Sequence, residues 1–223
     1  MTSVALRQTA LTMKPSYAPS PLPAAVADVS EAAAERAAIK AVLEGDVNAF
    51  QSLVEAHQTR VYNLAYRMLG NEKEAEDAAQ DAFTQAYARL RLYNPDWRFK
   101  TWMMTITSNL CIDRLRRRKI EPMSFADFTW PDSTHDADPV ENLFESHEPQ
   151  PDVVTVKRQQ QAVLQSMLAR LPPDDRSMVI MFYWDDMSYD DIVRATGLTV
   201  SAVKSRLFRA RQKLAQSPLA GRL

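Results

Sequence analysis

The sequence predicts an all-helical protein of two small domains joined by a flexible acidic linker. The first observation is the scarcity of glycine, with four residues in 223, since sheets and tight hairpins depend on glycine turns. The second is the abundance of Ala, Leu, Arg, Gln and Glu, which favour helices. The third is that apolar residues recur at three- and four-residue spacing on both sides of an acidic segment, as in amphipathic helices.

Shifts in composition along the chain predict the domain boundaries. Residues 1–27 carry four prolines among Ala, Ser and Thr, which predicts a disordered tail. Residues 120–156 contain nine Asp or Glu, five prolines and no Lys or Arg, so this segment repels itself and cannot form a packed core. We therefore assign the first domain to residues 28–119, the linker to 120–152 and the second domain to 153–218.

Four helices are predicted in the first domain, over residues 28 or 30 to 44, 46–69, 72–90 and 100–118. Gly45 ends the first helix, and Gly70 suits the left-handed position that follows the second. Asn71 with Glu74 three residues later resembles a capping box at the start of the third.

Four further helices are predicted in the second domain, over residues 153 or 156 to 170, 174–184, 189–196 and 201–216. Ser188 with Asp191 three residues later has the form of an N-cap followed by an acidic residue in the first turn. Gly197 breaks this helix, and Thr199 precedes the next. A helix, a glycine-containing turn and a second helix with inward apolar residues predict a helix-turn-helix motif.

The last helix is basic and begins with small residues, which would let its backbone enter the DNA major groove. Arg and Lys pair with phosphates, and Arg can bind guanine through a bidentate contact. The alternative is an ordinary helical hairpin with a solvated basic face, but the capped first helix and the glycine turn favour DNA binding. The candidate DNA contacts are Thr199, Ser201, Ala202, Lys204, Ser205, Arg206, Arg209 and Arg211.

The first domain interleaves aromatic and cationic residues before and along its fourth helix. Aromatic rings stack on unpaired bases, and nearby cations follow the phosphates, so this pattern predicts a groove for a separated DNA strand. Trp102 and Ile106 lie four residues apart and are expected in the core. The candidate contacts are Asn94, Trp97, Arg98, Lys100, Asn109, Arg114, Arg116 and Arg117.

Charge and composition exclude several classes of protein. The formal net charge of −1 hides a basic first domain and a basic second domain separated by the acidic linker, so it does not argue against nucleic-acid binding. One cysteine, Cys111, excludes an intramolecular disulfide and a thiolate-rich metal site. His57 is expected to be a partly exposed helix residue rather than a ligand or a base. We expect no metal, no cofactor, no small-molecule substrate, no enzymatic activity and no membrane insertion, and a cytoplasmic location.

The sequence resembles the extracytoplasmic-function (ECF) subfamily of bacterial RNA polymerase sigma factors. The runs 74–83 and 99–102, with Asn109, Asp113 and Arg114, look like sigma region 2, and the runs 171–172, 188–192, 197–198 and 203–211 look like sigma region 4. The resemblance implies a DNA-binding initiation subunit that directs core RNA polymerase to promoters. Two such regions joined by a linker form the arrangement of ECF sigma factors.

The resemblance also assigns roles to the predicted surfaces. It implies that the loop at 93–100 and the helix after it melt and read the −10 promoter element, while the helix at 199–211 reads the −35 element. Residues Asp77, Gln80 and Asp81 would bind the clamp helices of the polymerase largest subunit, although on chemistry alone they form a solvated helix face. An anti-sigma factor is a candidate partner. The alternative function is a helix-turn-helix regulator that acts without docking to polymerase.

Overall fold

A computed structural model describes residues 23–120 and 151–217, and every regular element within these ranges is a helix. This confirms the predicted all-helical class. The elements are α1 (Pro23–Leu43), α2 (Ala49–Leu69), α3 (Glu72–Ala88), the short 3-10 helix η2 (Leu90–Leu92), α4 (Phe99–Ile120), α5 (Pro151–Ala169), α6 (Pro173–Tyr183), α7 (Tyr189–Thr196) and α8 (Val200–Ala215).

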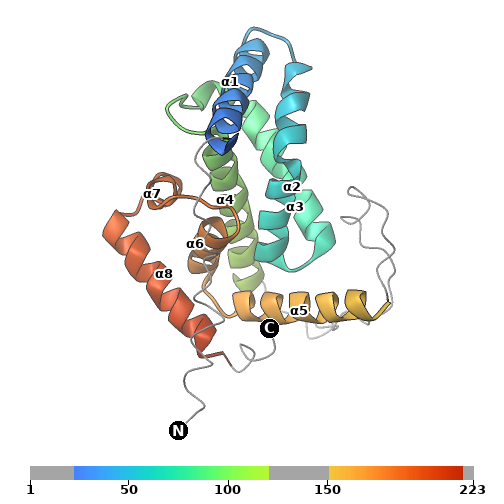
Figure 1. Ribbon diagram of the computed structural model, residues 1–223, viewed down its shortest axis with the longest axis vertical. Helices are drawn as coiled ribbons and strands as arrows, with labels where there is room; N and C mark the ends of the chain where they lie inside the picture. The colour runs from blue at the N-terminus through green and yellow to red at the C-terminus, as the bar shows by residue number, and fades with distance from the viewer. Residues whose placement is uncertain (1–22, 121–150, 218–223) are drawn as a thin grey trace.

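Helices α1–α4 form the first unit, in which α2, α3 and α4 pack against one another and α1 lies along α2 (Figure 1). The inner face of α3 consists of Ala75, Ala78, Ala82 and Ala86, all fully buried. Because a methyl side chain is short, α3 can approach its neighbours closely, and larger side chains of α2 and α4 fill the core.

The ends of these helices follow local rules. Gly70 has φ 75° after α2, and its N–H donates to the Tyr66 carbonyl oxygen. The Asn71 side chain accepts a hydrogen bond of 3.0 Å from the Glu74 N–H at the start of α3. Both features confirm the predicted boundary between the second and third helices, since a residue with positive φ ends one helix and an amide oxygen caps the next.

Several boundaries differ from the prediction. Helix α4 continues to Ile120, and α5 begins at Pro151, so both ends of the predicted linker are helical. Helix α1 begins at Pro23, so residues 23–27 are helical rather than part of a disordered tail; proline is favoured in the first turn of a helix because its missing N–H is not needed there. Helix α2 begins at Ala49 rather than at 46, because the Asp46 side chain accepts a hydrogen bond of 3.0 Å from the Asn48 N–H and forms a turn. Residues 1–22 of the predicted tail and 121–150 of the predicted linker lie outside the described residues.

Helices α5–α8 form the second unit, with α6 at its centre. Six consecutive residues of α6 are buried, from Arg176 to Met181. A helix is buried on every side only when neighbours surround it. Helices α7 and α8 cover one side of α6, and α2 and α4 of the first unit cover the other.

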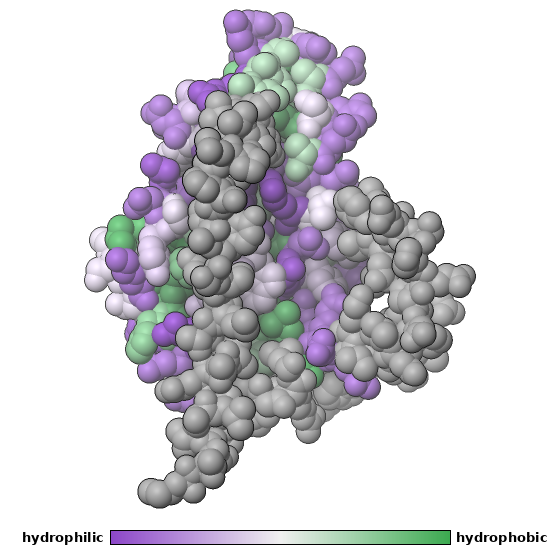
Figure 2. Space-filling view, in the orientation of Figure 1, coloured by the Kyte–Doolittle hydropathy of each residue, from purple (hydrophilic) through white to green (hydrophobic). Residues whose placement is uncertain are grey.

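The two units therefore touch directly, a feature that the sequence did not predict. Helix α7 lies against α4, α6 lies against α2 and α4, and α5 lies against α2. Figure 1 shows α7 and α8 on one flank of the molecule, with α5 crossing its lower end. The described part of the viewed surface is mainly hydrophilic (Figure 2). At the turn between α1 and α2, Leu43 and Val47 are exposed.

Candidate nucleic-acid and polymerase interfaces

Helices α7 and α8 form a helix-turn-helix, and a side chain caps the N-terminus of each helix. The Ser188 side chain accepts a hydrogen bond from the Asp191 N–H at 3.1 Å, and the Asp191 carboxylate accepts one from the Ser188 N–H at 3.2 Å. Gly197 has φ 70° and ends α7. Thr199 then accepts a hydrogen bond of 3.2 Å from the Ala202 N–H and starts α8. The predicted motif is confirmed in both its caps and its glycine turn.

Helix α8 divides into a buried face and an exposed, cationic face. Its buried residues are Val203, Leu207, Ala210 and Leu214. On the other side the structure brings together most of the predicted −35 contacts, and no acidic residue interrupts them. The exposed members of that set are Thr199, Ser201, Lys204, Ser205, Arg209 and Arg211, and Ala202 is half-buried.

Arg206 departs from this set. Its Nε forms an ion pair of 2.8 Å with Asp175 Oδ1 of α6, and the Arg206 side chain is 33% exposed. The guanidinium therefore ties α8 to α6 instead of pointing away from the domain, which conflicts with a base-reading role. The signal was present in the sequence, because Arg206 lies next to Leu207 and four residues before Ala210, at the edge of the inward face.

A cleft of about 500 Å³ adjoins the cationic face of α8, and its aromatic walls were missed in the sequence analysis. Lys204 Nζ lies 5.2 Å from the centre of the Tyr189 ring, and Arg211 Cζ lies 5.7 Å from that of Phe208. Phe208 is 51% exposed, and its position four residues after Lys204 could have indicated that it shares this face. The cleft is lined by Phe182, Tyr183, Tyr189, Lys204, Ser205, Leu207, Phe208, Arg209 and Arg211.

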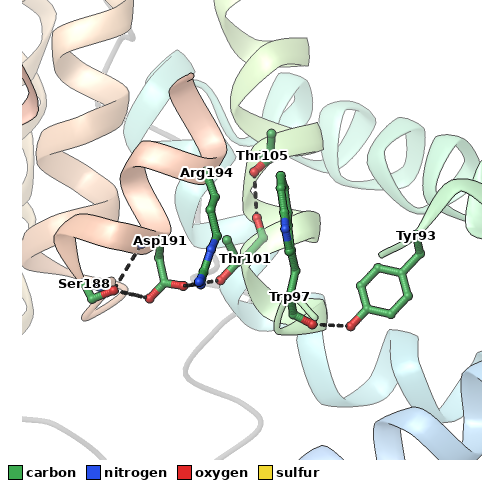
Figure 3. Close-up of polar contacts among 7 residues, drawn as sticks. All are labelled: Tyr93, Trp97, Thr101, Thr105, Ser188, Asp191 and Arg194. Atoms are coloured by element: carbon green, nitrogen blue, oxygen red, sulfur yellow. Dashed lines mark hydrogen bonds and ion pairs between the residues drawn. The ribbon is translucent and has the colours of Figure 1, made fainter. Parts of the chain in front are cut away.

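The loop before α4 is fixed by an aromatic cluster. The Tyr93 hydroxyl donates a hydrogen bond of 2.5 Å to the Trp97 carbonyl oxygen (Figure 3). The ring centres of Tyr93 and Trp102 lie 5.3 Å apart, and those of Phe99 and Trp102 lie 5.7 Å apart. Trp102 is half-buried and packs on the core, as predicted. Of the loop candidates, Asn94 and Arg98 are exposed and Trp97 is half-buried.

Lys100 does not lie with the exposed loop residues. Its ammonium donates to the backbone oxygen of Asp185, in the second unit. Burial, together with the nearby Arg60, lowers the pKa of Lys100. Burial also raises the pKa of Asp185 to about 6, against the opposing attraction of Lys100 and Arg67. The predicted strand-binding lysine is therefore enclosed between the two units.

The other predicted contacts on α4 are also divided between several surfaces. Arg114 forms an ion pair with Asp81 of α3, with Nη2 and Oδ2 2.5 Å apart, and donates to the Glu74 carbonyl oxygen. Arg116 donates to Asp174 of α6 at 3.0 Å. Asn109, Arg116 and Arg117 are exposed, and Arg116 stays so although it is paired with Asp174.

The predicted polymerase contacts are all exposed on α3. Asp77, Gln80 and Asp81 lie three and four residues apart, so they share one face of the helix. Asp81 also contacts a predicted DNA-binding residue, because its carboxylate forms an ion pair with Arg114.

The described residues hold no group of three or more His, Cys, Asp or Glu that could bind a metal ion. Cys111 is fully buried, and burial raises the pKa of its thiol to about 12, so it is a core residue rather than a nucleophile. His57 is fully buried, contrary to the expectation of partial exposure, and its Nε2 lies 2.8 Å from Glu35 Oε1 of α1. Within the described ranges, no helix is long and apolar enough to cross a bilayer.

Comparison with known proteins places this geometry in a family. The family model for Sigma-70 region 2 matches residues 53–120, and the model for Sigma-70, region 4 matches residues 161–214. The ECF RNA polymerase sigma factor SigW of Bacillus subtilis is 31% identical over 176 residues, which cover 79% of this chain and 92% of that protein.

This chain belongs to the ECF sigma factor family. The RNA polymerase sigma-H factor of Pseudomonas aeruginosa is also similar, with 30% identity over 79% of this chain and 89% of that protein. The fold resembles that of CnrH in its complex with the cytosolic domain of CnrY, with a TM-score of 0.58, 24% identity and coverage of 81% of this chain and 94% of CnrH.

The family and the function predicted from the sequence are thereby confirmed. As a sigma factor, the protein binds core RNA polymerase and promoter DNA and directs transcription initiation. The region 2 match ends at residue 120, one residue past the predicted first domain, and the region 4 match falls within residues 153–218. The exposed basic face of α8 lies within region 4. The roles of individual residues are the subject of the proposal below.

Proposed function

We propose that this sigma factor reads the −35 element with the exposed face of α8 and the −10 element with the loop and helix at the start of α4. The observation that carries this proposal is the uninterrupted cationic face of α8, presented by a helix that is capped and tied to its neighbour. An α-helix fits the major groove, where base edges differ in their donors and acceptors.

On α8, Lys204, Ser205 and Arg209 are the base-reading candidates, because they are exposed and lie within three turns of the helix start. Phe208 joins them as an exposed ring beside Lys204 and Arg211, where it can contact a thymine methyl group. Arg206 is reassigned to a structural role, since its guanidinium is already paired with Asp175.

At the start of α4, the candidates for contact with the opened strand are Asn94, Trp97 and Arg98. The Tyr93–Trp97 hydrogen bond holds the loop in one shape, so these side chains are placed before DNA arrives. Stacking of a base on Trp97 would contribute about 1–3 kcal/mol.

The remaining assignments rest on the family. Asp77, Gln80 and Asp81 are the proposed polymerase contacts on α3. An anti-sigma factor is a proposed regulator; the fold neighbours include RpoE of Bartonella quintana in complex with the anti-sigma factor NepR, with a TM-score of 0.55. The nucleotidyl chemistry belongs to the polymerase, and the site of action is the cytoplasm. The acidic segment 120–152 is predicted to mimic nascent RNA or to exclude DNA from the polymerase cleft.

The decisive experiment is run-off transcription with purified chain, bacterial core polymerase and a library of genomic promoter fragments. We expect promoter-dependent transcripts that Arg209→Ala and Arg98→Ala each reduce. Lys213→Ala on α8 and Arg91→Ala on η2 are the matched controls, because both are exposed cations outside the proposed sites. A chain that binds duplex DNA but neither binds core polymerase nor supports any transcript would overturn the proposal in favour of a regulator that acts without polymerase.

A further inference from the structure

A buried histidine connects α1 with the loop before α4. His57 of α2 is fully buried, and its Nε2 lies 2.8 Å from Oε1 of Glu35 on α1. The same ring packs on Phe99, the first residue of α4, with the two ring centres 5.2 Å apart. His57 therefore contacts both a carboxylate of α1 and the aromatic cluster that fixes the loop.

The hydrogen bond with Glu35 determines how the His57 ring is oriented. An ionised carboxylate only accepts hydrogen bonds, so Nε2 carries a hydrogen and donates it to Glu35. The other ring nitrogen, Nδ1, is buried and has no hydrogen-bond partner among the described residues. The Glu35 side chain is itself only 14% exposed, so little water competes for this bond. Glu35 is thus the group that holds the ring in one orientation.

A histidine at this position is a poor choice for stability alone. A buried polar atom without a partner costs free energy that an apolar side chain of similar size would not. The single hydrogen bond to Glu35 leaves Nδ1 in that condition. His57 is therefore better explained by the position that its ring gives to neighbouring side chains than by the stability it adds.

The aromatic cluster connects His57 to the loop. Phe99 meets the Tyr93 ring edge-on, with the ring centres 5.7 Å apart and an angle of 72° between the ring planes. The Tyr93 hydroxyl in turn donates to the Trp97 carbonyl oxygen (Figure 3). Because buried side chains are close-packed, a displaced ring displaces its neighbours. The contacts thus run without a break from His57 to Trp97, a proposed contact of the opened strand.

Helix α1 also reaches the loop directly. It packs against η2, the short helix that leads into the loop. Burial raises the pKa of Tyr93, and the charge of Glu35 raises it further, whereas Arg36 lowers it. Both α1 side chains are therefore within electrostatic reach of the Tyr93 hydroxyl, at the point where that hydroxyl holds the loop.

We propose that Glu35 and His57 are positioning residues, through which α1 holds the loop before α4 in the shape that receives the opened −10 strand. The inference rests on the proposed role of this loop in reading the −10 element. His57 is fully buried and Glu35 is an anion, so neither binds a DNA phosphate. They act by restricting the loop before the strand arrives, so that less conformational entropy is lost on binding.

This role adds a segment to the −10-reading unit. The residues that match the Sigma-70 region 2 model are 53–120, which include His57 and the whole loop. Glu35 and the rest of α1 precede that range. A residue outside the matched region therefore sets the geometry of a DNA contact inside it.

Binding of holoenzyme to a forked duplex tests the proposal. The probe carries the unpaired −10 strand of a promoter selected in the run-off experiment, and the holoenzyme contains the full chain. We expect Glu35→Ala to lower the affinity for this fork about fivefold, the lower end of the loss seen when a base no longer stacks on a ring. Glu35→Gln should retain most of the affinity, because its amide oxygen still accepts a hydrogen bond from His57.

Two controls separate positioning from a loss of stability. Val42→Ala removes apolar packing from α1 about two turns after Glu35, so it weakens the same helix without touching the hydrogen bond. It should lower the midpoint of urea denaturation and leave the affinity for the fork unchanged. Arg98→Ala is the positive control, because it removes a proposed direct contact. All variants should bind core polymerase and a −35 duplex as the unmodified chain does.

A double-mutant cycle tests whether the two residues act through each other. His57→Phe keeps an aromatic ring beside Phe99 and removes the hydrogen bond to Glu35. If the bond is the means of positioning, Glu35→Ala combined with His57→Phe loses no more affinity for the fork than the larger of the two single losses. Additive losses would show that the two side chains act independently and would overturn the pairing.

The outcomes distinguish the inference from the proposed function. If unmodified holoenzyme binds the fork no better than a fork with a scrambled −10 strand, the proposed function fails, and the positioning role fails with it. If unmodified holoenzyme prefers the −10 fork and Glu35→Ala matches its affinity, only the positioning role is wrong. The same conclusion follows if Glu35→Gln loses as much as Glu35→Ala, or if Val42→Ala loses as much at an equal loss of stability.

Discussion

Arg114 of α4 and Asp81 of α3 form an ion pair in which Nη2 and Oδ2 are 2.5 Å apart. This pair joins a residue predicted to bind polymerase to a residue predicted to bind the −10 element. The Arg114 and Asp81 side chains are 27% and 56% exposed, so the pair lies at the surface between the two functions. A substitution at Asp81 therefore changes both the predicted polymerase contact and the ion pair with Arg114. Asp77 is the better residue with which to test polymerase docking.

We expect Asp77→Arg to weaken binding to core polymerase without lowering thermal stability, since Asp77 is exposed on the outer face of α3. Asp81→Arg should weaken docking and also lower the free energy of unfolding by up to about 1 kcal/mol, because it places two arginines together. Binding is measured by competition for a fluorescent core polymerase, and stability by urea denaturation. Glu55→Arg on α2 is the charge-matched control, and a Glu55 variant that weakens docking equally would remove α3 from the interface.

The contact between Arg206 and Asp175 separates a structural arginine from a DNA-binding one. Arg206→Ala should destabilise the second unit by about 1 kcal/mol, because it leaves the half-buried Asp175 carboxylate unpaired. Arg209→Ala should leave stability unchanged and weaken promoter binding, since Arg209 is exposed on α8. Thermal denaturation and fluorescence anisotropy on a −35 duplex measure the two effects.

A double-mutant cycle with Asp175→Ala confirms the source of the Arg206 effect. If the ion pair is responsible, the double variant is less destabilised than the sum of the two single variants. Purely additive losses would show that Arg206 acts through some other contact. A loss of sequence discrimination in Arg206→Ala with unchanged stability would return this residue to the DNA-reading set.

Gly197 is the turn of the helix-turn-helix, with φ 70° and open space where a Cβ atom would lie. Gly197→Ala should lower the free energy of unfolding by about 1 kcal/mol, solely from backbone strain. Gly197→Asn should lose less, because asparagine tolerates the left-handed region. Urea denaturation of the two variants measures the difference. A much larger loss for both would mean that the turn is packed against something other than solvent.

Local features of the sequence predicted most of the fold. Ser188, Asp191 and Gly197 act within a few residues of one another, so their side chains and backbone angles determine where α7 begins and ends. The inner and outer faces of α8 likewise follow from helical spacing. The helix-turn-helix and most of its exposed cations could therefore be placed before the structure was known.

Contacts between residues far apart in sequence were not predictable in the same way. His57 was expected to be partly exposed, but its partner Glu35 is 22 residues away on α1 and encloses it. Lys100 looks like part of an aromatic and basic loop, yet it meets Asp185, 85 residues later. Neither pair of residues has a regular spacing in the sequence that would predict the contact. These side chains are brought together only by the packing of helices that are distant in sequence.

The burial of Asp185 predicts a dependence of stability on pH. Burial raises the pKa of Asp185 to about 6, whereas an unfolded aspartic acid titrates near pH 4. Because the folded pKa is the higher one, the folded state binds a proton between these values and the unfolded state does not. The contribution of this group to the free energy of unfolding is present below about pH 4 and falls by about 3 kcal/mol as pH rises through 6.

Asp185→Asn removes this titration, so the comparison of the two proteins isolates it from every other group. We expect the free energy of unfolding of the unmodified chain, relative to that of Asp185→Asn, to decrease between pH 4.5 and pH 7, a window taken from the two pKa values. Urea denaturation at several pH values measures the difference. Asp190→Asn is the control, because it removes an exposed carboxylate that does not contribute to the raised pKa of Asp185. If the difference between the unmodified chain and Asp185→Asn is constant across this range, the pKa of Asp185 is not raised on folding. The carboxylate would then be ionised already at pH 4.5 and would reach solvent.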